Sequence, residues 1–178
     1  MSRVVFSMGS NLGDREANLT AAITAVAPQA VSEVYETLPW GGDDEQPAYY
    51  NIAVIAEDPD RGADDWLALG QHLEAEAGRV RDPRRPYGPR TLDVDLIAVY
   101  DEDGAPVHRS EERLTLPHPL AHLRAFVLVP WFAVDRDAEL PGKGRVRDLL
   151  RDESIAADAR ALRRLHPIWS GHGDPSKP

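Results

Sequence analysis

The segment at residues 88–97, GPRTLDVDLI, constrains this chain most, because it sets two acids inside an otherwise apolar strand. Side chains of a strand alternate between its faces, so Asp93 and Asp95 are predicted to share one face, roughly 7 Å apart. The same alternation places Ile97 and Val99 on that face. Neighbouring carboxylates repel each other, and burial penalises their charge further. The pattern therefore predicts a positive partner, which is a divalent cation held by oxygen ligands, or arginines, or both.

Mg²⁺ fits such a pair well, because proteins usually hold it with one or two carboxylates together with substrate phosphates. An Asp-x-Asp pattern alone is a weak signal, however. A solvated strand start with two exposed acids remains the alternative for these residues.

The segment before the strand, RVRDPRRPYGPR at residues 79–90, is basic although the formal net charge of the chain is -10. Its prolines and glycine predict a loop. Guanidinium groups bind phosphate in a bidentate manner, so a loop of cations next to two acids suggests nucleotide phosphates bridged by Mg²⁺. The cationic residues of this loop are Arg79, Arg81, Arg84, Arg85 and Arg90.

The composition of the 178-residue chain excludes several classes. A pI near 5.0 argues against a nucleic-acid-binding protein. The lack of cysteine excludes disulfides, thiolate zinc sites and thiol nucleophiles. No apolar run has the length of a membrane span, and the N-terminus lacks the plan of a signal peptide. We expect a cytoplasmic monomer, with one domain at residues 1–151 and a weakly ordered tail at 152–178.

Hydrophobic periodicity predicts the order strand, helix, strand, strand, helix, strand. This order is typical of an α+β, ferredoxin-like βαββαβ core, with an antiparallel sheet and two helices on one face. A further hairpin is expected at 107–116 and a helix at 125–134 despite Pro130. The core strands are expected at 4–7, 31–37, 49–56 and around the two aspartates, and its helices between Asp14 and Pro28 and at 63–77.

Some polar residues admit more than one interpretation. His118 and His122 could form a metal pair, but Pro119 lies between them and no third ligand is evident, so we favour a phosphate donor at His118 and a surface position for His122. Arg124 is either a solvated helix start or an anion contact. Asn51 inside an apolar strand is suited to bind the edge of a heterocycle. The GSNLG segment near the N-terminus lacks the lysine of a phosphate-binding loop and is interpreted as a turn.

Taken together, these residues resemble the 6-hydroxymethyl-7,8-dihydropterin pyrophosphokinase family. The resemblance covers residues 4 to about 150 in order and rests most strongly on GPRTLDVDLI. The other fragments are GSNLGD, TLPWG, YYNIAV, GRVR, RLTLPHP and RAFVLVP, together with the helix that carries Gln71 and Glu74.

The resemblance implies transfer of a pyrophosphoryl group from ATP to a pterin alcohol in folate biosynthesis, with AMP as the leaving group. It implies that Asp93 and Asp95 hold two Mg²⁺ ions and that Arg79, Arg81 and Arg90 join them in catalysis. The implied ATP contacts are Gln71, Glu74, Arg81, Arg90, Ile97, Arg113, Thr115, His118 and Arg124. The implied pterin contacts are Thr37, Leu38, Trp40, Tyr49, Asn51, Tyr87 and Phe126.

The chain departs from the family pattern at the two loops. Tyr87 stands where many members carry tryptophan, and Trp40 is bulkier than the aliphatic residue of some members. The arginine loop is one residue longer than in shorter relatives, which leaves the alignment of Arg84 and Arg85 open.

Two other functions use part of the same pattern. A Mg²⁺-dependent nuclease or nucleotidyltransferase would use the aspartates but needs a basic polynucleotide track. A nucleotide-sensing module without chemistry would keep the arginines and could dispense with one aspartate.

Overall fold

The computed structural model describes residues 1–38 and 46–171. Its centre is an antiparallel sheet with the strand order β10-β3-β4-β1-β5, and β2 pairs with β4 beside β3. The strands of this sheet are β1 (Ser2–Ser10), β2 (Ala30–Val31), β3 (Tyr35–Thr37), β4 (Tyr49–Asp58), β5 (Asp93–Tyr100) and β10 (Arg163–Arg164).

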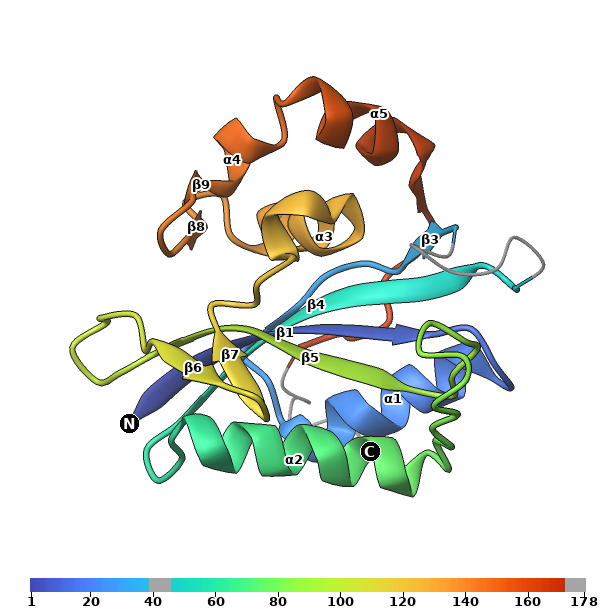
Figure 1. The fold of residues 1–178 in the computed structure, drawn as a ribbon, viewed down its shortest axis with the longest axis horizontal. Helices are drawn as coiled ribbons and strands as arrows, with labels where there is room; N and C mark the ends of the chain where they lie inside the picture. Colours follow the sequence, from blue (N-terminus) through green and yellow to red (C-terminus); the bar gives the residue numbers. More distant parts are fainter. Residues whose placement is uncertain (39–45, 172–178) are drawn as a thin grey trace.

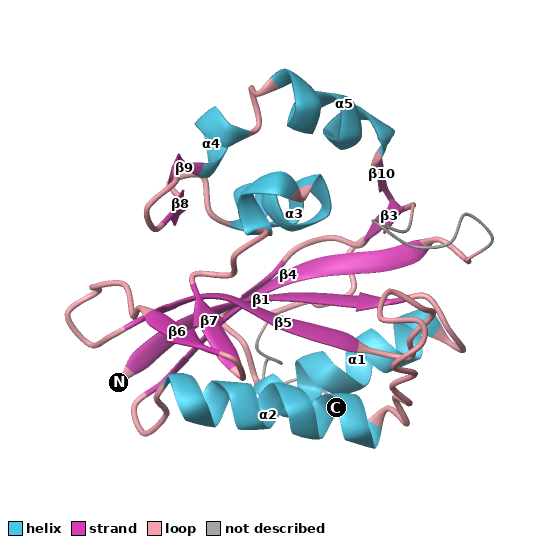
Figure 2. Ribbon diagram, in the orientation of Figure 1, coloured by secondary structure: helices cyan, strands magenta, loops and turns pink. Residues whose placement is uncertain are grey.

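Helices cover the sheet on both faces (Figures 1 and 2). Two helices, α1 (Arg15–Val26) and α2 (Ala63–Glu76), lie below it in this view, as the ferredoxin-like prediction requires. Above it lie α3 (Ala125–Val134), which is the helix expected at 125–134, and two further helices, α4 (Val146–Leu149) and α5 (Glu153–Ala161). The expected hairpin is formed by β6 (Arg109–Glu111) and β7 (Leu114–Leu116). A short turn of helix, η1 (Ala121–Leu123), and a small hairpin, β8 (Glu139–Leu140) with β9 (Gly144–Arg145), complete the described elements.

The two helical layers explain why the central strands are densely apolar instead of strictly alternating. One cluster of buried side chains joins the sheet to α1 and α2, and a second joins it to α3 and α5. Helix α3 is apolar almost all round because it lies between the sheet and the outer helices, and it accommodates Pro130 within its span. No helix in the described parts of the chain is long and apolar enough to cross a membrane.

The prediction of a single strand at 31–37 is wrong in detail, because this segment forms two strands, β2 and β3. The break lies at Ser32. Its amide donates to the carbonyl of Ala53, and its hydroxyl accepts from the amide of Ala53, both at 2.9 Å. Val34 then pairs with the C-terminal segment, through His166 and Leu165, and not with β4.

Two further strands differ from the prediction, one in which side chains share a face and one in its length. The pairing of β1 with β5 shifts between Val5 and Phe6, so Ile97 forms a β-bulge. After the bulge Val99 packs with the α1 and α2 side and no longer shares a face with the aspartates. At the other end, β1 extends to Ser10, so Gly9 lies in a strand and not in the predicted turn.

The expectation of weak order after residue 151 does not hold for residues 153–171. Asp152 caps α5 through its side chain, Ile155 is buried against α3, and β10 pairs with β3. These contacts are all tertiary or capping interactions, which explains why a polar, alanine-rich composition did not reveal them. Residues 172–178 lie outside the described residues, and the division of the chain at residue 151 stays a prediction.

Candidate active site

A cavity of about 820 Å³ opens beside the start of β5, between α2, the arginine loop, the β6–β7 hairpin and the start of α3. Its walls come from segments far apart in the sequence, which the sheet order brings together. Among its lining residues are most of those proposed from sequence: Thr37, Leu38, Tyr49, Asn51, Gln71, Glu74, Arg79, Arg81, Tyr87, Arg90, Asp93, Asp95, Arg113, Thr115, His118, Arg124 and Phe126.

One proposed site residue in the described parts of the chain does not line the cavity. The side chain of Ile97 is fully buried in the bulge, on the α3 side, and its carbonyl accepts a hydrogen bond from the His118 amide at 2.9 Å. Ile97 therefore contributes its backbone, by fixing His118. Trp40 lies outside the described residues.

The aspartate pair is surrounded by guanidinium groups. Asp93 contacts Arg79 at 2.9 Å and Arg90 at 3.2 Å, while Asp95 contacts Arg124 at 3.6 Å. Each carboxylate keeps about a quarter of its side-chain surface exposed, at 25% and 27%. The pair is therefore accessible from the cavity, and arginines provide part of the positive charge that the sequence pattern required.

Glu74 on α2 links this pair to the arginine loop. One of its carboxylate oxygens contacts both Arg79 and Arg81, and the other accepts from the amide of Val94 at 3.1 Å. Burial raises the pKa of Glu74, which Arg79 opposes. Arg79 is held at 9% exposure, whereas Arg81 keeps 71% of its side chain exposed. Arg79 is therefore a fixed member of the network, and Arg81 is available to a ligand.

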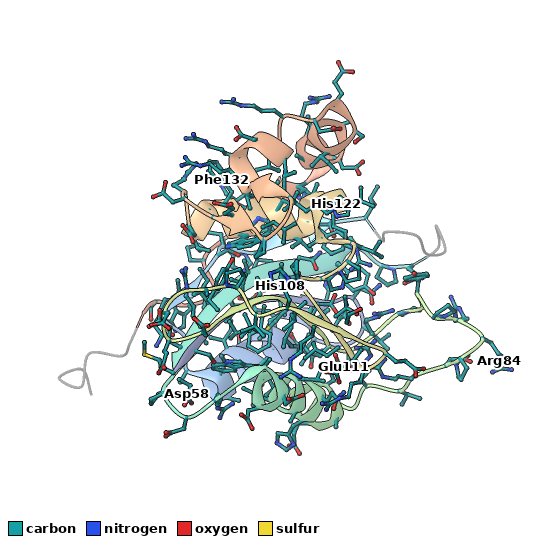
Figure 3. All side chains as sticks on the ribbon, turned by 60° about the vertical axis from the view of Figure 1, so that its left-hand side comes forward. Asp58, Arg84, His108, Glu111, His122 and Phe132 are labelled. Atoms are coloured by element: carbon teal, nitrogen blue, oxygen red, sulfur yellow. The ribbon has the colours of Figure 1, made fainter. Side chains whose placement is uncertain are left out.

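The rest of the loop extends away from the protein. Arg84 lies at its tip, where it pairs with Asp82 and points into solvent (Figure 3).

The charge around Asp95 suits a bound divalent cation. Burial, and then the neighbouring charge of Asp93, raise the pKa of Asp95 to about 7. A cation at this position would relieve both effects. In the described part of the chain, no group of three or more His, Cys, Asp or Glu side chains is placed to hold a metal ion. Two carboxylates that leave further positions for phosphate oxygens correspond to the usual protein contribution to a Mg²⁺ site.

Another part of the cavity wall combines an amide with aromatic rings. Asn51 donates from its side chain to the hydroxyl of Thr37 at 2.6 Å, and Tyr49 and Phe126 line the same cavity. A Cβ atom at Gly9 would lie 2.6 Å from Oδ1 of Asn51, so only glycine leaves room for this side chain. A glycine inside a strand was the available signal for Gly9, which the sequence interpretation missed.

Asn11 is a second residue that the sequence interpretation missed. Its side-chain amide donates to Gln46 at 3.3 Å and to the carbonyl of Pro47 at 3.1 Å, and its oxygen accepts from the Arg90 amide at 2.9 Å. Gln46 in turn donates to the carbonyl of Tyr87 at 2.8 Å. Asn11 therefore joins the end of the β3–β4 connection to the end of the arginine loop.

Replacing Asn11 with alanine is expected to lower the free energy of unfolding by about 1–3 kcal/mol, because it leaves buried backbone groups without partners. Urea unfolding measures the change. Asn18→Ala is the matched control, since that side chain bonds only within its own segment, to Ser10 and Leu12. Equal losses for both variants would contradict the role given to Asn11.

His118 faces the cavity in a defined tautomer. Its Nδ1 accepts from the amide of Leu120 at 3.1 Å, so the proton of the neutral ring is on Nε2. Burial, and then the charge of Arg124, lower the pKa of His118 to about 4. At neutral pH this side chain is a neutral N–H donor. His122 does not line the cavity.

The depressed pKa of His118 predicts a pH-dependent stability. The unfolded chain takes up the proton near pH 6.5 and the folded chain only near pH 4, so stability is lost as the pH falls through this window. The loss is at most about 3 kcal/mol. Asp95 acts in the opposite direction over the same range, so the loss is measured as a difference: between pH 7 and pH 4, urea unfolding should show the stability of the original protein falling relative to that of His118→Asn. His72→Asn, at an exposed position of α2, should behave like the original. Identical profiles for the original protein and His118→Asn would contradict the assignment.

Comparison with known proteins points to one family. The sequence model of the family described as 7,8-dihydro-6-hydroxymethylpterin-pyrophosphokinase matches residues 5–136. A protein of Mycobacterium tuberculosis named 2-amino-4-hydroxy-6-hydroxymethyldihydropteridine pyrophosphokinase is 47% identical over 177 residues, which cover 95% of this chain and 93% of the relative. The Mycobacterium leprae protein of the same name is 54% identical over 154 residues, covering 83% and 79% of the two chains.

Solved structures agree on the fold. The crystal structure of wild-type Plasmodium falciparum HPPK-DHPS with STZ-DHP superposes with a TM-score of 0.60 at 11% identity. The superposition covers 92% of this chain and 46% of the Plasmodium chain, so this chain spans about half the length of that protein.

Proposed function

Because the chain belongs to the 7,8-dihydro-6-hydroxymethylpterin-pyrophosphokinase family, we propose that it transfers the pyrophosphoryl group of ATP to 6-hydroxymethyl-7,8-dihydropterin in folate biosynthesis, releasing AMP. The observation that carries this proposal is the composition of one cavity. A carboxylate pair with arginines and the Asn51–Thr37 pair with aromatic rings line the same cavity. Such a cavity can hold a polyanion beside a flat heterocycle.

ATP would bind between α2 and the β6–β7 hairpin. Arg81 and Arg113 have exposed guanidinium groups that can contact phosphate oxygens, and the Nε2–H of His118 is a further donor. Arg113 is held in place by Asp64 at 2.7 Å and by Glu111 at 3.2 Å. Gln71, Glu74, Thr115, Arg90 and Arg124 complete the proposed nucleotide contacts.

We propose Asp93 and Asp95 as the residues that hold two Mg²⁺ ions. When bound there, Mg²⁺ would neutralise phosphate charge and ease deprotonation of the pterin hydroxyl. Arg79 and Arg90 already contact Asp93 and would remain beside it to limit the repulsion between the carboxylates.

The pterin would lie against Tyr49, Tyr87 and Phe126, with Asn51 and Thr37 at its polar edge, and Leu38 and Trp40 are further proposed contacts. A flat ring gains from aromatic neighbours, and a buried amide edge requires hydrogen-bond partners. Asn51 is 5% exposed and already bonded to Thr37, so its orientation is fixed before the ligand arrives.

The chemical step is an in-line attack of the pterin hydroxyl on the β-phosphorus of ATP. The cavity contributes mainly by positioning the two substrates and by stabilising charge on the transferred group, for which Arg81 is the proposed contact. No residue needs to act as a strong general base. Closure of the arginine loop would exclude water and limit ATP hydrolysis.

The reaction can be tested directly by mixing protein, Mg²⁺, ATP and the reduced pterin alcohol and separating the nucleotides. AMP that forms only with the pterin is the expected product. ADP as the product, or AMP formed without the pterin, would refute the proposal. We further propose that the protein acts as a cytoplasmic monomer, without nucleic acid or membrane, and gel filtration tests the oligomeric state.

A further inference from the structure

The chain that follows α5 crosses from one face of the sheet to the other along the edge of β3 (Figure 1). Leu162 packs with the cluster on the α3 side, whereas Leu165, Ile168 and Trp169 pack with the cluster on the α1 and α2 side. Residues 162–169, here called the edge segment, are thus anchored in both cores.

The edge segment completes the hydrogen bonding of β3. Arg163 lies opposite Glu36 in antiparallel register. The amide of Leu165 donates to the carbonyl of Val34 at 2.8 Å, and the amide of Val34 donates to the carbonyl of His166 at 2.9 Å. Strand β3 has only three residues and pairs with β4 on its other side. Without the edge segment it would be a short, exposed edge strand, which is a weakly held element.

Strand β3 leads directly into the cavity. It ends at Thr37, whose hydroxyl accepts the hydrogen bond from Asn51, and Thr37 and Leu38 line the cavity wall. The position of β3 therefore determines where Thr37 meets Asn51.

One carboxylate extends this support to the start of β4. Glu36 contacts Arg163 of the edge segment at 2.8 Å and Arg15 of α1 at 3.8 Å. Arg15 donates to the carbonyl of Ala48 at 2.8 Å and stacks on Tyr50, with 3.8 Å between the guanidinium carbon and the ring centre. The edge segment is thereby connected to both ends of the β3–β4 connection, on either side of residues 39–45.

We propose that the edge segment, acting through Glu36, is a positioning element for the part of the cavity wall formed by Thr37 and Asn51, and that Arg163 is its positioning residue. The inference rests on the proposed function, because it takes this part of the wall as the pterin site. The ion pairs of Arg163, Arg164 and His166 are with Glu36, Glu33 and Glu16, and the backbone hydrogen bonds of Leu165 and His166 are with Val34, so these contacts do not involve Arg81, Arg113 or His118. Loss of the edge segment is therefore expected to affect one substrate and spare the other.

Two neighbouring charge reversals in the full-length chain provide a matched test. Arg163 and Arg164 have nearly equal exposure, 70% and 71%, and each faces a glutamate, but Glu33, the partner of Arg164, is not shared with Arg15. Arg163→Glu is expected to raise the dissociation constant of the pterin about 3–10-fold, and that of a non-hydrolysable ATP analogue less than about twofold. Arg164→Glu should change neither by more than about twofold, and Arg163→Lys should retain pterin affinity. Calorimetric titration measures both ligands.

Each of the other outcomes has a defined interpretation. Equal weakening of both ligands by Arg163→Glu, or an equal pterin effect of Arg164→Glu, indicates general destabilisation and overturns the inference. Unchanged pterin affinity in Arg163→Glu overturns the inference alone, provided that the original protein binds the pterin. Failure of the original protein to bind the pterin overturns the proposed function together with the inference that depends on it.

Discussion

Replacing Asp95 with asparagine is expected to lower the rate of AMP formation about a thousandfold or more and to leave a protein that is no less stable. The loss of rate corresponds to about 4 kcal/mol of transition-state stabilisation, which is a reasonable contribution for a ligand of catalytic metal. An amide has the same shape as the carboxylate and can still accept from Arg124, but it lacks the charge that holds a cation.

The stability expectation follows from the raised pKa of Asp95, which is about 7. A carboxyl group whose pKa is higher in the folded than in the unfolded chain destabilises the fold when it is ionised. For Asp95 the full destabilisation is present above pH 7 and is absent below the unfolded pKa near 4. Urea unfolding at pH 8 should therefore show equal or greater stability for Asp95→Asn.

The exposed acid Glu102, in the turn after β5, provides the control. Glu102→Gln should retain both the original rate and the original stability. Near-original activity of Asp95→Asn would remove Asp95 from the proposed metal site, and a stability loss of several kcal/mol would show that its charge is needed by the fold.

Replacing Arg81 with alanine is expected to lower kcat by about a hundredfold while the affinity for ATP changes less than about threefold. Arg81 is mostly exposed and pairs with Glu74, so it can move to the transferred group when the loop closes. Rapid-quench measurement of a single turnover, together with equilibrium binding of an ATP analogue, separates the two quantities.

Arg84 is the matched control for Arg81. Its side chain is 89% exposed at the loop tip and pairs only locally, with Asp82. Arg84→Ala should change kcat by less than about threefold if it has no catalytic contact. If the binding loss of Arg81→Ala equals its loss of rate, Arg81 acts in ground-state binding instead of the chemical step.

The parts of the fold that could be predicted from sequence are those encoded within single segments. Helical periodicity identified α1 and α2, with Asp14 as the cap of α1, the apolar run at 125–134 identified α3, and the acid pair in β5 identified the centre of the site. Register could not be read in the same way, because the bulge at Ile97 depends on how β5 pairs with β1. The break at Ser32 likewise depends on Ala53, a residue of another strand.

The residues missed at the site have the same explanation. Asn11 and Gln46 look like ordinary loop residues until three separate segments meet around them. The edge segment has a polar composition, and its order comes from an open position beside β3 and from apolar residues that reach both cores. Such contacts exist only in the folded chain, so no local sequence pattern predicts them.

The two attachments of the arginine loop suggest how this fold can tolerate changes of loop length. Glu74 fixes Arg79 at the start of the loop, and Asn11 fixes Arg90 at its end. Residues 82–85 lie between these points and include the exposed tip. An insertion or deletion there alters this stretch and leaves both attachment points unchanged. This segment is accordingly the place where loop closure could be retuned, by evolution or by design, without rebuilding the catalytic centre.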